Sequence, residues 1–229
     1  MPNDPERRAS PYLRAAVVAA SAMLMLSIAM RLAEMYVGST AATLPADFTS
    51  GAYLEHFGLA MIHLVPGVAF VVLGAGQVSA RVRRRWPAWH RWSGRAFVLV
   101  ASAIGVSGIW MNEIFPSVGG VLKYTGALFF GVAMLASLGL GVVAIRRGRV
   151  GAHRAWMIRA WAIGLGVGAQ RLILLPLFVA FGMLDDLLIG LGMWAGWAIS
   201  LAVAEWVIRR RRELPSAAAS RAATASGAG

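Results

Sequence analysis

Six long apolar runs, separated by connections that alternate between arginine-rich and arginine-poor, constrain this chain more than any other feature. The runs cover residues 15–37, 56–78, 95–115, 121–145, 159–181 and 187–208. A helix of about 20 apolar residues crosses the hydrocarbon core of a bilayer. Because 59% of the 229 residues are hydrophobic and only 14% are charged, too little polar chain remains to surround a soluble core. The sequence therefore predicts an all-α, polytopic membrane protein with six transmembrane helices.

The basic residues fall on one side of this predicted topology. The chain has 22 lysines and arginines. Nineteen of them lie before the first run, after the sixth, or in and next to the connections that follow the second and fourth runs. The three exceptions are Arg31, Lys123 and Arg171. Cytoplasmic connections collect Lys and Arg, so we predict a bacterial inner-membrane protein with both termini in the cytoplasm. Anionic lipid head groups are the expected partners of these clusters. The net charge of +12 therefore requires no nucleic acid.

Polar or small-residue tails flank the predicted membrane domain. We expect a cytoplasmic tail over residues 1–12, a six-helix domain over 13–212 and a disordered cytoplasmic tail over 213–229. The first run is long for a signal peptide and lacks a clear end, so we expect it to remain as a helix. The absence of cysteine excludes disulfides, thiolate catalysis and cysteine-bound metals.

The second and third runs resemble the fourth and fifth. Gly67 is followed after 23 residues by His90, and Gly131 is followed after 22 residues by His153. In both copies a basic cluster precedes the histidine and an arginine follows it. The pattern predicts a duplicated hairpin of parallel orientation, and chance similarity between apolar segments is the alternative. If the repeat is real, these four helices form a core with the first and sixth outside it.

His63 and Arg171 are two of the ionisable residues that lie inside apolar runs. Such residues are costly in a membrane and indicate function by default. His63 shares a small-residue face with Gly67, and a histidine hydrogen-bonded between helices is the structural alternative. The guanidinium of Arg171 needs a carboxylate, carbonyl groups or a bound anion, so an ion pair with Glu34 or Glu113 is the alternative there. The functional hypothesis is one outward-facing pocket formed by His63, Arg171, Gln170, Arg31, Glu34, Asn112, Glu113 and Tyr124.

Two basic corners lie at the predicted cytoplasmic edge. They contain His90, Arg91 and Arg95 in one copy, and His153, Arg154 and Arg159 in the other. Two histidines at one depth on separate hairpins are the minimum for bis-histidine ligation of a haem, or they could share a metal. The simpler alternative is a corner that caps helix ends and binds lipid phosphate, with neighbouring tryptophans at the membrane interface.

No nucleotide-binding, zinc-protease or serine-hydrolase motif is present, so we lean away from an enzyme. The segments 63–67, 83–95 and 153–159, together with Gln77 and Arg171, resemble a family of prokaryotic predicted membrane proteins designated domain of unknown function 2306. The resemblance covers about residues 55–175. It implies a membrane protein of the six-helix type and no particular catalysis.

These observations favour a protein that binds or passes a small amphiphile or anion in an outward-facing pocket around His63 and Arg171. No cofactor is firmly implied. One alternative is a b-type haem redox protein that uses His90 and His153. Another is a structural or assembly subunit, or a homo-oligomer, because the many glycines allow close lateral contacts between helices.

Overall fold

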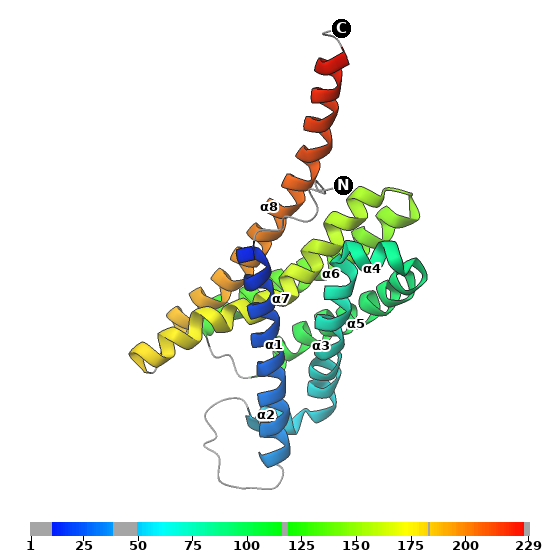
Figure 1. The fold of residues 1–229 in the computed structure, drawn as a ribbon. Helices are drawn as coiled ribbons and strands as arrows, with labels where there is room; N and C mark the ends of the chain where they lie inside the picture. Colours follow the sequence, from blue (N-terminus) through cyan, green and yellow to red (C-terminus); the bar gives the residue numbers. More distant parts are fainter. Residues whose placement is uncertain (1–10, 39–49, 116–118, 183, 227–229) are drawn as a thin grey trace.

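The computed structural model describes residues 11–38, 50–115, 119–182 and 184–226, and every regular element in these ranges is an α-helix (Figure 1). Six helices are long and apolar enough to cross a membrane. The predicted all-α fold with six spans is therefore confirmed. The long helices are α1 (Pro11–Gly38), α3 (Phe57–Val78), α5 (Pro87–Ile114), α6 (Gly120–Arg146), α7 (Val150–Phe181) and α8 (Asp186–Ser226), and the short ones are α2 (Ser50–Glu55) and α4 (Ala80–Arg85).

Helices α5 and α7 begin about two turns before the apolar runs that predicted them, so they include the basic corners. Pro87 starts α5, where its fixed φ suits the first helical turn and its missing N–H is not needed. Gly148, with a φ of 70°, permits the tight turn from α6 into α7. The corner histidines are consequently held on helices rather than in loops.

The arginine-rich connections lie together at one end of the molecule. In Figure 1 the start of α1, helix α4, the α6–α7 turn and the C-terminal part of α8 all lie toward the top, whereas α2 lies far from them. We term the end that carries α4 and the α6–α7 turn the basic end, and the end that carries α2 the opposite end. The single-sided distribution of charge predicted from the sequence is therefore present in the fold.

Four helices pack in chain order around the centre. Helix α5 packs against α3 and α6, and α6 packs against α7. Helices α1 and α8 pack mainly on α7. This arrangement agrees with a core of the second to fifth spans with the first and sixth outside, while the duplication itself stays a hypothesis.

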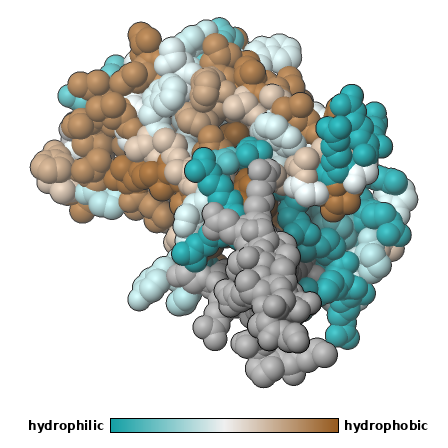
Figure 2. All heavy atoms as spheres, turned by 90° about the horizontal axis from the view of Figure 1, so that it is seen from above, coloured by the Kyte–Doolittle hydropathy of each residue, from teal (hydrophilic) through white to brown (hydrophobic). Residues whose placement is uncertain are grey.

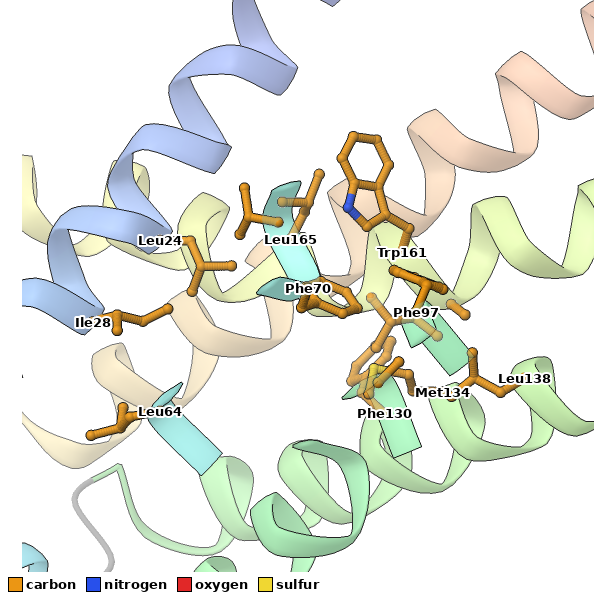
Figure 3. Packing of buried hydrophobic residues seen from close by; sticks show 14 of the residues in the cluster. Leu24, Ile28, Leu64, Phe70, Phe97, Phe130, Met134, Leu138, Trp161 and Leu165 are labelled. Carbon is orange, nitrogen blue, oxygen red and sulfur yellow. The ribbon is translucent and has the colours of Figure 1, made fainter. Parts of the chain in front are cut away.

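Aromatic side chains fill much of the core, and glycines on neighbouring helices leave the space that these side chains occupy. Phe70 of α3 and Phe97 of α5 stack with ring centroids 5.3 Å apart, and Figure 3 shows them beside Trp161 of α7. A Cβ atom on Gly164 would lie 2.3 Å from Cζ of Phe70, and one on Gly168 would lie 2.0 Å from a backbone carbonyl oxygen of α1. The glycines are thus required for close helix packing, as is usual in membranes.

Large apolar side chains cover much of the outside, as a lipid-embedded protein requires. Val72, Leu99 and Val121 expose 63%, 72% and 77% of their surface. Figure 2 shows a broad hydrophobic surface next to hydrophilic residues that gather toward one part of the view. Such continuous apolar surfaces are rare on soluble monomers, so the exposed faces of these helices are expected to contact lipid.

The last helix continues beyond the sixth apolar run. Residues 213–229 were expected to be a disordered tail, but α8 continues as a helix to Ser226. This stretch is rich in alanine, the residue with the highest intrinsic helix propensity, and it extends a helix that is already nucleated in the span. The last three residues lie outside the described part of the chain.

Candidate functional site

A cavity of about 790 Å³ lies at the basic end between α3, α5, α6 and α7. Its size is within the range of about 300–1,000 Å³ that is typical of ligand sites in proteins. Its walls are largely apolar and include Phe97, Val98, Val142, Met157 and Trp161. None of the residues that line it is an aspartate or a glutamate. The cavity therefore combines an apolar interior with an excess of positive charge.

Five arginines supply that charge from four helices. They are Arg83 of α4, Arg91 and Arg95 of α5, Arg146 of α6 and Arg154 of α7. The guanidinium of Arg95 also lies 4.9 Å from the ring centroid of Trp92. Because arginine stays protonated at any physiological pH, this positive field is permanent.

His153 lines the cavity, and a hydrogen bond to the backbone defines the tautomer of its ring. Its Nδ1 lies 2.9 Å from the carbonyl oxygen of Gly141 on α6, and since a carbonyl only accepts, Nδ1 must carry the proton. The missing side chain of Gly141 allows this approach of α7, because a Cβ there would lie 2.9 Å from Sδ of Met157. In a neutral His153 the lone pair is therefore on Nε2.

His90 has a fixed backbone and an unpartnered ring. Gln77 of α3 donates from Nε2 to the His90 carbonyl oxygen at 3.2 Å and to Ser93 Oγ at 2.7 Å. The ring nitrogen Nδ1 is buried without a hydrogen-bond partner. His153 is close enough to His90 to act on it electrostatically. The structure therefore brings the two corner histidines to one cavity.

Trp161 adds a second buried group without a partner. Its indole Nε1 makes no hydrogen bond within the described part of the protein. The indole lies directly on Gly74, where a Cβ would be 2.0 Å from Nε1. Buried polar groups in native proteins almost always have a partner, so two unpartnered ones in the wall of one cavity indicate a missing acceptor or donor.

At the opposite end, Arg171 lies near a group on α1 and α2. Arg31 Nη1 is 2.6 Å from Glu34 Oε2, and the Arg31 guanidinium is 4.7 Å from the ring centroid of Tyr53. Arg31, Glu34 and Tyr53 all act electrostatically on Arg171, which itself makes no hydrogen bond or ion pair with a described residue. Burial raises the pKa of the Tyr53 phenol, while Arg31 and Arg171 oppose that shift.

His63 is held against α5. Its Nδ1 lies 3.0 Å from Ser107 Oγ, and Ser107 donates its own hydrogen to the Ala103 carbonyl oxygen at 2.6 Å. The imidazole must therefore donate from Nδ1. Gly108 provides room for the ring, since a Cβ there would be 3.1 Å from Cε1. No hydrogen bond among the described residues links His63 with the group around Arg171.

The remaining residues of the hypothetical outward pocket have partners of their own. Gln170 is 2% exposed and donates to the Met193 carbonyl oxygen of α8 at 3.1 Å. Tyr124 donates its hydroxyl to Glu113 at 2.9 Å. Lys123 donates to Asn112 Oδ1 at 3.0 Å, and Asn112 donates to the Tyr124 carbonyl oxygen at 3.1 Å. Glu113 is thus paired with Tyr124 rather than with Arg171.

One corner arginine serves packing rather than the cavity. Arg159 of α7 pairs with Glu205 of α8 through two bonds, Nε to Oε1 at 2.5 Å and Nη2 to Oε2 at 3.0 Å. Its guanidinium also lies 4.5 Å from the ring centroid of Trp156. This bidentate contact fixes α8 against α7. The other five residues of the two corners all line the cavity.

Several residues of these sites were not identified from the sequence. Trp161 and Ser107 lie inside the predicted apolar runs and were not singled out. Tyr53 lies on α2, within a stretch expected to be an outer loop. Arg83 and Arg146 were identified only as members of basic clusters. The one available signal was that these clusters flank the repeated histidines on both sides.

Comparison with protein families identifies the family of this chain. A family model described as predicted membrane protein, DUF2306, matches residues 60–208, which include every residue that lines the cavity. The match extends beyond the 55–175 stretch of the resemblance and includes most of the sixth span. No curated protein and no solved structure matches the chain.

Proposed function

We propose that this chain, which belongs to the DUF2306 family of predicted membrane proteins, binds an amphiphilic anion in the cavity at its basic end. One observation carries the proposal. Five arginines border a largely apolar cavity of about 790 Å³, and no carboxylate lines it. The ligand class is therefore a molecule with an apolar body and one or more acidic groups.

Electrostatics favours an anion at this place. Five guanidinium groups around one opening repel one another, and the attraction of each to an anion is stronger near a low-dielectric interior than in water. Guanidinium groups also match carboxylate and phosphate oxygens geometrically, with two parallel hydrogen bonds. A bound acidic group would neutralise part of this field and would be held at the rim.

The apolar wall favours a hydrophobic body on the same ligand. Burial of apolar surface contributes about 25 cal/mol per Å². His90 and Trp161 line the cavity, but their unpartnered nitrogens are buried away from it. Apolar contact with the wall, rather than a hydrogen bond to these nitrogens, therefore supports the proposal.

Oleate and oleyl alcohol provide a matched test, since they share a chain and differ in the carboxylate. The protein in neutral maltoside detergent is titrated with each, and the thermal unfolding midpoint is measured. Oleate is expected to raise the midpoint progressively, as a ligand of the folded state does, and the alcohol much less. In Arg91→Gln/Arg154→Gln the oleate affinity should fall about tenfold, or about 1.4 kcal/mol.

The control removes two arginines of α8 from the same end. Neither Arg209 nor Arg210 lines the cavity, so Arg209→Gln/Arg210→Gln should keep the oleate response. Equal stabilisation by oleate and oleyl alcohol would refute the proposal. So would an equal loss of affinity in both double variants.

A second candidate is an anion site at the opposite end, as the sequence suggested. It is favoured by Arg171, which lies beside Arg31 and Tyr53 and makes no ion pair with a described residue. We expect octanoate to stabilise the protein less in Arg171→Gln than in the wild type, and equally in Arg91→Gln/Arg154→Gln. The same response of Arg171→Gln and wild type would exclude this site.

The orientation in the membrane is part of the proposal. Positive residues favour the cytoplasmic side, so we infer that the basic end faces the cytoplasm of a bacterial inner membrane, next to anionic lipids. Reporter fusions at residues 88 and 151 should give cytoplasmic signals and fusions at 118 and 184 periplasmic ones. Periplasmic signals from 88 or 151 would reverse the orientation.

A role as an assembly subunit remains a prediction without a supporting contact.

A further inference from the structure

The two corner histidines occupy equivalent places on two helices that border one cavity. His90 is the fourth residue of α5, and His153 is the fourth residue of α7. Helices α5 and α7 both pack against α6. Each histidine lines the cavity and reaches it from a different hairpin of the suspected repeat. The fold thus presents a pair of imidazoles to one enclosed space.

The chemistry of the pair is that of metal ligands. Histidines that bind a metal usually donate their other N–H to a carbonyl or carboxylate, which fixes the ring. His153 has this arrangement, since Nδ1–H donates to Gly141 and the Nε2 lone pair remains. His90 makes no hydrogen bond through its ring within the described residues, and because its Nδ1 is buried, Nε2 is the nitrogen that would bind a ligand.

A bare metal ion does not fit this site. Structural zinc takes four protein ligands and catalytic zinc takes three, whereas the described residues contain no cluster of three or more histidine, cysteine, aspartate or glutamate side chains. Five arginines around the cavity would also repel a free cation. A metal held here has to arrive with its own additional ligands and with negative charge.

A metalloporphyrin meets each of these requirements. Its ring supplies four equatorial nitrogens and leaves two axial positions, which matches two histidines. Its apolar face suits a wall of Phe97, Val98 and Met157. Its two propionates suit the arginines at the rim, by the bidentate pairing that guanidinium groups make with carboxylates. Because the chain has no cysteine, covalent attachment through thioethers is excluded.

We infer that the ligand of the basic-end cavity is a b-type haem, with His90 and His153 as its two axial ligands. This inference rests on the proposed function, because haem is one member of the class of amphiphilic anions. The inference specifies the ligand within that class. It also gives the two histidines a role as axial ligands, which the binding of oleate does not require. Haem binding and oleate binding can therefore fail separately.

The test is the absorption spectrum of the complete protein. The chain is expressed in haem-replete cells, purified in neutral detergent, and titrated with hemin if it is not already saturated. We expect one haem per chain with the sharp Soret, α and β bands of low-spin, bis-imidazole iron after reduction with dithionite. Competition by oleate should displace or weaken the haem, because both ligands use the same cavity.

Substitution of single histidines provides the matched comparison. His90→Ala and His153→Ala should each abolish the low-spin spectrum, and His63→Ala should leave it unchanged. His63 lies against Ser107 of α5 and does not line the cavity. His90→Gly with added imidazole should restore the low-spin bands, which shows that the variant is folded and that its cavity is intact.

The outcomes separate the two proposals. A wild-type protein that binds oleate through the arginines but no haem overturns the haem assignment and leaves the proposed function in place. A low-spin spectrum that survives both His90→Ala and His153→Ala also overturns it. Failure to bind either oleate or haem overturns both proposals together.

Discussion

Most polar side chains described at the opposite end of the bundle, Arg171 excepted, pair with one another, whereas many of those at the basic end line a cavity. Lys123, Asn112 and Tyr124 form a chain of hydrogen bonds, and Asp186 accepts one from the backbone N–H of Gly119 at 2.8 Å. At the basic end, His90 and Trp161 keep buried nitrogens without partners, and five arginines face a space with no carboxylate. The two ends therefore differ in how many of their polar groups have a partner within the protein.

This contrast indicates where a ligand is needed. A network that satisfies itself stabilises the fold and gains little from a bound molecule, because each donor already has an acceptor. A set of donors and cations around an apolar cavity remains incomplete until a ligand arrives. The pair of Arg159 and Glu205 shows that the basic end can pair its charges where α8 supplies a carboxylate. Among the described residues that line the cavity there is no aspartate or glutamate.

Removal of that carboxylate should have the largest effect on stability. Glu205→Ala leaves Arg159 without its bidentate partner in a half-buried position. We expect a loss of about 1–3 kcal/mol, below the value for a fully buried pair because both side chains are partly exposed. Thermal unfolding in detergent measures it. The double variant Arg159→Ala/Glu205→Ala should lose less than the sum of the single variants, and strict additivity would mean that the pair contributes nothing.

The next effect concerns His63. Ser107→Ala removes the hydroxyl that accepts from His63 Nδ1, and the stranded N–H should cost about 1–2 kcal/mol. Oleate affinity should stay unchanged, because neither residue lines the cavity. A change in oleate affinity without loss of stability would show that the two regions are coupled and that our division of the molecule is wrong.

A smaller effect is expected for the network at the opposite end. Lys123→Met deletes the donor to Asn112 and should cost about 1 kcal/mol or less, the net value of one partly exposed hydrogen bond. The unfolding midpoint and the oleate titration are both measured. If Lys123→Met weakens oleate binding as much as Arg91→Gln/Arg154→Gln does, the ligand is not confined to the basic end.

The smallest effect on stability should come from Trp161→Phe. This change removes an indole N–H that has no partner. The free energy of unfolding of the ligand-free protein should therefore stay within about 0.5 kcal/mol of the wild-type value or rise slightly. Ligand affinity should fall, because Trp161 lines the cavity and the smaller phenyl ring makes fewer contacts with a ligand. A strongly destabilised ligand-free protein would show that the indole nitrogen contributes to folding in a way that the structure does not reveal.

The sequence predicts the spans well because helix length and hydropathy are local properties. Its failures are equally physical. The basic corners were expected outside the helices, because hydropathy cannot tell a charged first turn from a loop, and Pro87 and Gly148 set those boundaries instead.

The sites were predictable only in part. His90 and His153 could be paired from their similar spacing, 23 and 22 residues, from Gly67 and Gly131 in the two hairpins. The grouping of His63 with Arg171 depended on depth alone, and depth says nothing about lateral neighbours. The structure places His63 of α3 against Ser107 of α5, and Arg171 of α7 near residues of α1 and α2. Trp161 could not be recognised at all, since its role depends on Gly74 of another helix.

Single-cysteine labelling tests the central claim most directly, because the chain has no cysteine of its own. Ile158→Cys places a thiol in the cavity wall, and Gly58→Cys places one in open space at the start of α3. With oleate at ten times its dissociation constant, maleimide should label position 158 about tenfold more slowly and position 58 at an unchanged rate. Equal rates at position 158 with and without oleate would contradict the account.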